Sequence, residues 1–249
     1  MHTHLAVSGR RALGFCHSQA ALAGVLILSS LLLTPLSIHQ AFARWATPED
    51  MDYSVEYRDW DITVHRDGTF EELVEDETLI LKDSARMSRG VVRLNYNPEV
   101  SKLEILQAET ILGEKRIPVS RGLIEDKPLA SSGEGFDQWH QVMIAFPGVD
   151  VGSRVHLRYR MKWQKVNTPG FFSTQFFYGS EYQKKSRLSI RSELPMIFEI
   201  NDPREELIVK KSPKSIEVRL KAPLLKAVVD ENDPLLPPSL FANVSEIGR

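Results

Sequence analysis

Candidate acid–base chemistry in this chain depends on three histidines, His65, His140 and His156, because the other four precede residue 43 in a segment with the features of an export signal. A nucleophilic site needs a hydroxyl or thiol within hydrogen-bond reach of such a base, which a third group orients. His65 precedes a polar turn and His156 alternates with arginines along a strand, so we expect both to face solvent. His140 follows a Ser- and Gly-rich loop, the kind of segment that carries function on a rigid sheet. A polar residue at the start of a strand is nevertheless an ordinary structural feature, and we predict no catalytic residue.

Aromatic side chains are the other candidates for ligand contact. Five rings occur in the eight residues 171–178, and Trp139 stands beside His140. Such rings either line a groove for a peptide or glycan or cap the core of a β-sandwich. The residues that we predict as candidate ligand contacts are Trp139, His140, Phe171, Phe172 and Tyr178.

The sequence predicts no bound metal and no cofactor. No two histidines have the spacing of metal ligands, and the acidic run 230–233 lacks the glycine and distal glutamate of a calcium loop. The Gly-rich run 131–135 has no P-loop lysine. Cys16 is the single cysteine and lies in the amino-terminal segment, so the remaining chain has neither a disulfide nor a thiolate.

The first 43 residues have the pattern of a cleaved signal peptide. Arg10 and Arg11 precede an apolar run from Ala20 to Leu33, and small residues at Ala41 and Ala43 predict a cut after Ala43. An uncleaved anchor over residues 20–38 is the alternative. We therefore expect a periplasmic or secreted protein with no membrane segment after cleavage. The formal net charge of −2 argues against a nucleic-acid partner.

Short alternating runs predict an all-β fold for residues 44–222. Trp60, Ile62 and Val64 alternate with polar residues up to the turn Asp67-Gly68, which predicts a hairpin. Further strands follow at close intervals, with one or two short helices near residues 82–88 and 120–127. This pattern predicts an antiparallel two-sheet β-sandwich, in which Pro147, Gly148 and Gly152 turn one inner strand into its neighbour. Residues 223–249 predict a Pro-rich, linker-like tail.

Several segments resemble the β-rich domain of unknown function that precedes the transglutaminase-like core in exported bacterial proteins of the transglutaminase family. They are Asp67-Gly68-Thr69 and residues 102–128, 142–160 and 168–190, and the resemblance covers roughly residues 53–220. In that family the presumed chemistry belongs to a Cys-His-Asp triad in the downstream core. The chain ends before such a core, so no catalytic residue carries over.

Taken with this resemblance, the sequence predicts a non-catalytic, exported accessory module that recruits or positions a partner in the cell envelope. A transglutaminase-like protein or another envelope protein is the expected partner. A glycan- or peptidoglycan-binding module is one alternative. A truncated or split transglutaminase-like enzyme without its catalytic core is another.

Overall fold

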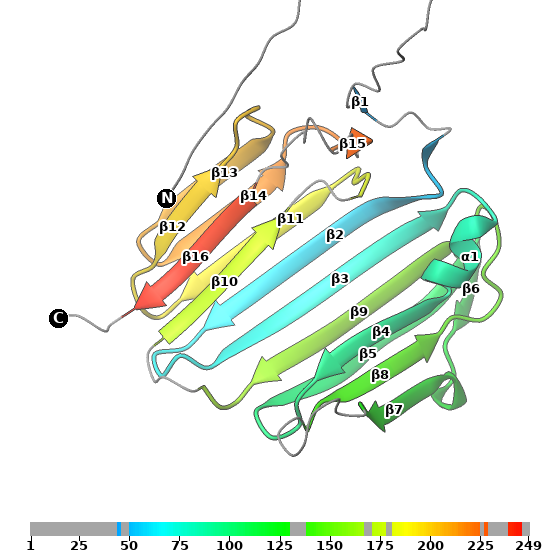
Figure 1. Ribbon diagram of the computed structural model, residues 1–249, viewed down its shortest axis with the longest axis horizontal. Helices are drawn as coiled ribbons and strands as arrows, with labels where there is room; N and C mark the ends of the chain where they lie inside the picture. Colours follow the sequence, from blue (N-terminus) through cyan, green and yellow to red (C-terminus); the bar gives the residue numbers. More distant parts are fainter. Residues whose placement is uncertain are drawn as a thin grey trace, which may run out of the picture. The chain divides into compact units, whose positions relative to one another are not determined.

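A large sheet of eight strands organises the computed structural model, which describes residues 44–45, 50–129, 138–166, 171–177, 181–224, 227–228 and 239–245 (Figure 1). Neighbouring strands are antiparallel except for β11 and β2, which are parallel. In order across the sheet the strands are β13 (Leu207–Ser212), β14 (Ser215–Leu220), β11 (Ser186–Ser192), β2 (Tyr53–Val64), β3 (Phe70–Ile80), β9 (Arg154–Trp163), β5 (Ser101–Leu112) and β6 (Lys115–Pro118).

Two three-stranded sheets pack against the large sheet. The two small sheets share no strand with each other or with the large sheet. One consists of β4 (Val91–Tyr96), β8 (His140–Ala145) and β7 (Ile124–Pro128), and the other of β10 (Phe171–Phe177), β16 (Ser239–Ser245) and β12 (Ile197–Asn201). A separate two-stranded ladder joins β1 (Arg44–Trp45) to β15 (Ala227–Val228).

Both small sheets cover the same face of the large sheet, which we call the covered face. Directly opposed residues of a sheet share a face, and residues two apart on a strand share it as well. Ile62 opposes Glu72, and Leu157 opposes Asp76 on the same strand β3, so Ile62 and Leu157 lie on one face. Ile62 belongs to the core formed with β10, β16 and β12, and Leu157 to the core formed with β4 and β8.

The predicted all-β sandwich is therefore confirmed, with two differences: β11 and β2 are parallel rather than antiparallel, and the second layer is divided. That layer consists of two separate sheets over two separate cores rather than one continuous sheet. The short helices are α1 (Ser84–Arg89) and η2 (Arg121–Leu123), close to where the sequence predicts them. Within the described ranges, no helix has the length and hydropathy that crossing a bilayer requires.

The first hairpin forms as predicted between β2 and β3. Gly68 has a φ of 89°, a conformation that glycine adopts without strain. The Asp67 carboxylate accepts hydrogen bonds from the Thr69 amide and hydroxyl at 2.9 and 2.7 Å. This Asx-type turn fixes the register in which Val64 opposes Phe70.

The predicted hairpin around Pro147, Gly148 and Gly152 is wrong in its pairing. Both glycines have positive φ, 66° and 84°, so the chain does reverse there. However, β8 pairs with β4 and β7, whereas β9 pairs with β3 and β5. The segment connects the two layers of the sandwich, since a turn reverses the chain without specifying which strand becomes the neighbour.

Part of the predicted tail is a structural strand, which corrects the expectation of a linker for those residues. Seven residues, Ser239–Ser245, form β16, which pairs with β10 on one side and β12 on the other (red in Figure 1). Leu240 is fully buried in the core below this sheet. The strand becomes visible only in the tertiary structure because the acidic and Pro-rich run before it has the composition of a linker.

Candidate functional site

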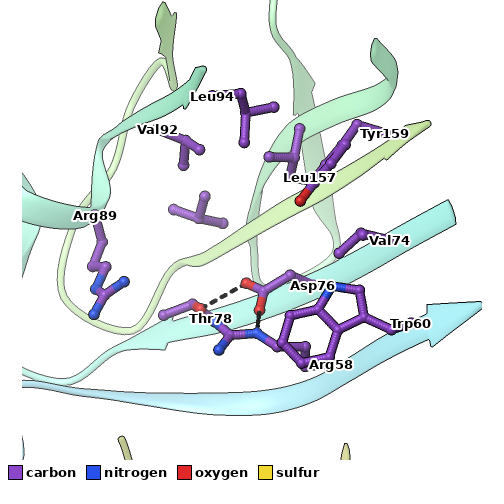
Figure 2. A pocket seen from close by; sticks show the side chains of 11 residues that line it. Arg58, Trp60, Val74, Asp76, Thr78, Arg89, Val92, Leu94, Leu157 and Tyr159 are labelled. Atoms are coloured by element: carbon purple, nitrogen blue, oxygen red, sulfur yellow. Dashed lines mark hydrogen bonds and ion pairs between the residues drawn. The ribbon is translucent and has the colours of Figure 1, made fainter. Parts of the chain in front are cut away.

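A cavity of about 200 Å³ lies on the covered face, between the two cores. We call it the central pocket. Its floor comes from β2, β3 and β9, and one wall comes from the end of α1 and from β4 (Figure 2). The lining residues are Arg58, Trp60, Val74, Asp76, Thr78, Arg89, Val92, Leu94, Val155, Leu157 and Tyr159.

Arg58 is the centre of a partly buried charge cluster at this pocket. Its Nε donates to Asp76 Oδ2 at 2.5 Å, and its Nη1 donates to Glu181 Oε2 at 2.7 Å. The Thr78 hydroxyl donates to the other oxygen of Asp76 at 3.0 Å. Burial opposes the charge of Arg58, but the two carboxylates outweigh burial and raise its pKa.

Glu181 joins the floor of the pocket to its wall. Its Oε1 accepts from Arg89 Nη2 at 2.7 Å and from the Tyr53 hydroxyl at 2.9 Å. The Arg89 guanidinium also lies 3.6 Å from the centroid of the Tyr53 ring. Burial acts to raise the pKa of Glu181, but Arg58 and Arg89 more than offset it, so this pKa is lowered. Glu181 therefore stays ionised and holds both guanidiniums.

Apolar and aromatic side chains form the rest of the pocket. Trp60 lies on the floor with the Arg58 guanidinium 5.7 Å from its ring centroid, and Val74 is buried beside it in β3. Burial and then the nearby Glu72 raise the pKa of Tyr159. Burial alone raises the pKa of Glu72 to about 7. The hydroxyl of Tyr159 thus remains protonated and can donate a hydrogen bond.

The charged groups at this pocket are already paired with one another. The two guanidiniums, of Arg58 and Arg89, and the two carboxylates, of Asp76 and Glu181, have a total formal charge of zero. Each of these four groups already forms a hydrogen bond with another of them. The described lining residues include no histidine, serine or cysteine, and their carboxylate and hydroxyl groups are those of Asp76, Thr78 and Tyr159. The pocket combines apolar surface with fixed polar groups on its floor and its wall.

His140 and Trp139 lie away from the central pocket, at the start of β8. His140 Nδ1 is 2.9 Å from Asp126 Oδ1 on β7, and Asp126 Oδ2 accepts from the Tyr96 hydroxyl of β4 at 2.7 Å. The rings of Tyr96 and His140 meet edge to face at 5.7 Å. Burial and the bond to Asp126 raise the pKa of Tyr96 to about 12. The trio ties three strands together, and Trp139 is half-buried beside it.

Of the three aromatic residues predicted as ligand contacts in residues 171–178, one is a core residue and two cannot be assigned a side-chain position from the described part of the structure. Phe172 is only 3% exposed and packs edge-on against Phe70, with ring centroids 4.9 Å apart. It is a core residue, so the prediction of a ligand contact there needs correction. Phe171 belongs to β10, but its side chain lies outside the described part of the structure, as does all of Tyr178.

His156 is also not the solvent-facing residue that alternation predicts. It lies on the uncovered face of the large sheet, yet it is only 5% exposed. Its Nε2 is 3.1 Å from Glu75 and its Nδ1 is 3.4 Å from Glu109. The centroid of the Tyr57 ring lies 6.3 Å from that of the His156 ring, and the two carboxylates beside it also pair with Arg158 and Arg116, so long side chains on neighbouring strands cover it. His65 is exposed, as predicted.

Sequence reasoning missed the central pocket, although the sequence contains a signal for it. Arg58 lies in the same alternating set as Trp60 and Ile62, and Glu72 and Asp76 lie in the set of Val74. Burying a charged residue on the apolar face of a strand costs folding free energy unless the charge is paired. Three such residues on adjacent strands therefore mark a buried polar site.

The described residues contain no group of three or more metal-ligating side chains close enough to hold an ion. This observation covers only those residues. The expected absence of a metal or cofactor therefore stays a prediction.

Comparison with solved structures supports the fold. The crystal structure of a "putative protease" from Parabacteroides distasonis has a TM-score of 0.68 and 16% sequence identity, over 78% of this chain and 41% of that one. This chain thus spans well under two thirds of that protein. Yeast LTA4 hydrolase (12% identity, TM-score 0.37, 84% and 33% coverage) and an M1 zinc metallopeptidase from Deinococcus radiodurans (11%, 0.32, 78% and 42%) are too distant to support an argument.

Sequence comparison identifies the family. No curated protein is significantly similar to the chain. Residues 66–229 match a family described as a Domain of Unknown Function with solved-structure structure, DUF3857. The expected resemblance to a β-rich domain of unknown function is thereby confirmed, while the association with a transglutaminase-like core stays a prediction. The chain belongs to the DUF3857 family of domains of unknown function.

Proposed function

We propose that this chain is an exported, non-catalytic module that positions a protein partner in the cell envelope. The observation that carries the proposal is the central pocket, whose charged lining residues Arg58, Asp76 and Arg89 are neutralised together with the adjacent Glu181, beside apolar side chains. A catalytic site needs a group whose protonation or nucleophilicity is set for reaction. The charges of Arg58, Asp76 and Arg89 are instead held in fixed pairs, which is typical of a preorganised binding surface.

The partner that we propose is a transglutaminase-like protein or another envelope protein. This choice follows from the resemblance of residues 102–128 and 142–160 to the domain that accompanies such cores. A module with two packed cores and a rigid sheet can hold a partner at a fixed distance and orientation. Export is part of the proposal and rests on the signal-like pattern of the first 43 residues.

The proposal is tested by assaying the purified chain for hydrolysis and cross-linking of peptide substrates. We expect no turnover with the unmodified chain or with His140→Ala. Turnover that disappears in His140→Ala would show an enzyme and would end the proposal. In parallel, an amine-reactive cross-linker applied to intact producing cells is expected to give discrete adducts of this chain with an envelope protein.

A glycan-binding module remains the second candidate because of the surroundings of Trp139. The half-buried indole is adjacent in sequence to His140, whose partner Asp126 supplies a fixed carboxylate. An aromatic face beside polar groups is one way to bind a sugar ring. Sedimentation with purified peptidoglycan distinguishes this candidate: retention that Trp139→Ala abolishes would favour it, and a soluble chain would remove it.

A further inference from the structure

One edge of β4 lies beside the central pocket, and in the described part of the chain it has no paired strand. Strand β4 pairs with β8 through its other edge, and among the described residues no strand pairs with this one. The Phe146 amide donates to the Gly90 carbonyl at 2.8 Å, and the two residues are in register. Hydrogen-bonded pairs alternate along an antiparallel ladder. The N–H and C=O groups of Val91, Arg93 and Asn95 therefore point away from β8, toward the free edge.

The same strand supplies the wall of the pocket. Val92 and Leu94 line the pocket, while Arg93 and Asn95 are exposed on the opposite side of the strand (Figure 2). A segment paired with the free edge would alternate in the same way, since side chains of neighbouring strands share faces in register. Every second side chain of that segment would face the large sheet, and one of them would lie in the pocket, above Val74 and Trp60.

The edge strands β6, β7 and β13 have features that discourage pairing, whereas β4, like the edge strands β10 and β12, has few. Proline and charged side chains protect exposed edges. The edge strand β6 has the sequence KRIP, β7 has IEDKP, and β13 ends in KKS. In contrast, β4 has the sequence VVRLNY, with one charge and no proline. Its composition favours pairing at this edge over pairing at β6, β7 or β13.

The pocket also restricts what can enter it. At about 200 Å³ it is smaller than the sites that enclose drug-sized ligands, which occupy about 300–1,000 Å³. It can hold a single large side chain. Arg58 and Arg89 are already neutralised by Asp76 and Glu181, so an entering charge would find no unpaired counter-charge. An uncharged apolar side chain, in contrast, would bury surface against Trp60 and neighbouring aliphatic groups.

We propose that the free edge of β4 receives an extended segment of the partner protein, which adds a strand to the β4–β8–β7 sheet and places an apolar side chain in the central pocket. This inference rests on the proposed function and specifies where and how the partner binds. Backbone hydrogen bonds to Val91, Arg93 and Asn95 supply affinity, and the pocket supplies specificity.

The test uses the purified chain and synthetic peptides as probes. Each capped peptide has the length of β4 and is threonine throughout except for one of its two central residues, which is leucine, phenylalanine, aspartate or lysine. Hydrogen exchange followed by NMR is the measurement. We expect the leucine and phenylalanine peptides to protect the amides of Val91, Arg93 and Asn95, and the aspartate and lysine peptides to leave them unprotected.

Two variants and two matched controls separate the edge from the pocket. Arg93→Pro removes an edge donor without removing a bond to β8, and Val92→Phe fills the pocket. Each is expected to weaken binding of the leucine peptide about tenfold, the effect of losing roughly 1.4 kcal/mol. Arg93→Ala keeps the donor, and Asn95→Phe adds the same ring on the exposed side. Both controls are expected to bind the peptide with less than about a twofold change. Circular dichroism checks that all four fold.

The outcomes distinguish this inference from the proposed function. Absence of protection at the three amides with both apolar peptides would overturn strand addition, even where cross-linked envelope adducts persist. Equal loss of binding in Arg93→Pro and Arg93→Ala would assign the contact to charge and overturn it as well. A dimer of this chain that Arg93→Pro dissociates would make a second copy the occupant, contrary to the inference.

Discussion

The Arg58 guanidinium donates to the Glu181 carboxylate at 2.7 Å, although the two residues are 123 positions apart in the sequence. Their side chains are 19% and 13% exposed. This contact joins β2 of the large sheet to the segment that leads into β11. Glu181 also accepts a hydrogen bond from Arg89, which lies in the pocket wall next to β4. It therefore holds together the parts from which the pocket is built.

Replacing Glu181 by Gln should destabilise the fold measurably. The change leaves Arg58 and Arg89 without a shared counter-charge in a site with little exposure, and we expect the free energy of unfolding to fall by about 2 kcal/mol. Urea denaturation gives the value, and a double-mutant cycle with Arg58→Met isolates the pair. Glu125→Gln breaks an exposed pair with Lys127 and should change stability by less than about 0.5 kcal/mol. Similar losses in both would contradict a structural role for the cluster.

Glu72 should make stability depend on pH. Burial raises its pKa from 4.5 to about 7, so between these values the native chain retains a proton that the unfolded chain releases. The free energy of unfolding must then fall as the pH rises through this window. We expect Glu72→Gln to be more stable than the unmodified chain by about 2 kcal/mol at pH 8 and nearly equal at pH 4. Denaturation at several pH values measures this.

A control for the pH experiment is Glu114→Gln, which removes an exposed carboxyl in the turn between β5 and β6. It should keep the pH dependence of the unmodified chain. A fall in stability across the window that survives in Glu72→Gln would show that another group causes it.

His156 and His65 offer a matched comparison of burial. Both lie near carboxylates, His156 at 3.1 Å from Glu75 and His65 at 3.4 Å from Glu193. Their side chains are 6% and 48% exposed. We expect His156→Gln to cost about 1–2 kcal/mol, because the buried imidazole lies between Glu75 and Glu109, and the Glu109 side chain is only 9% exposed. His65→Gln should stay within about 0.5 kcal/mol. Thermal denaturation compares the two variants, and equal effects would refute the role assigned to the buried network.

Leu240 tests whether β16 belongs to the folded core. The side chain is fully buried among residues of β2, β11 and β14, so Leu240→Ala should destabilise the fold by about 3 kcal/mol. Ile197→Ala on the neighbouring strand β12 removes a side chain that is 62% exposed and should have little effect. Chemical denaturation measures both. If Leu240→Ala left the stability of the fold unchanged, residues 239–245 would have to be regarded as a linker after all.

The sequence alone determined the strands and their buried faces to a large extent. Alternation of Trp60, Ile62 and Val64 with polar residues sets one face of β2, and Asp67-Gly68 fixes its hairpin with β3. These features are local, because a period of two residues and a glycine with positive φ act within a few positions of the chain. The all-β class follows from them.

The tertiary structure alone decided which strands became neighbours and where the polar site formed. Alternation defines a face but does not name the strand that covers it, so Gly148 and Gly152 predict a reversal equally well for a hairpin and for a change of layer. Likewise, the role of Arg58 depends on its hydrogen bonds to Asp76 and Glu181, which only the folded chain brings together. Pairing energies between distant residues depend on burial and geometry, which are properties of the assembled sheets.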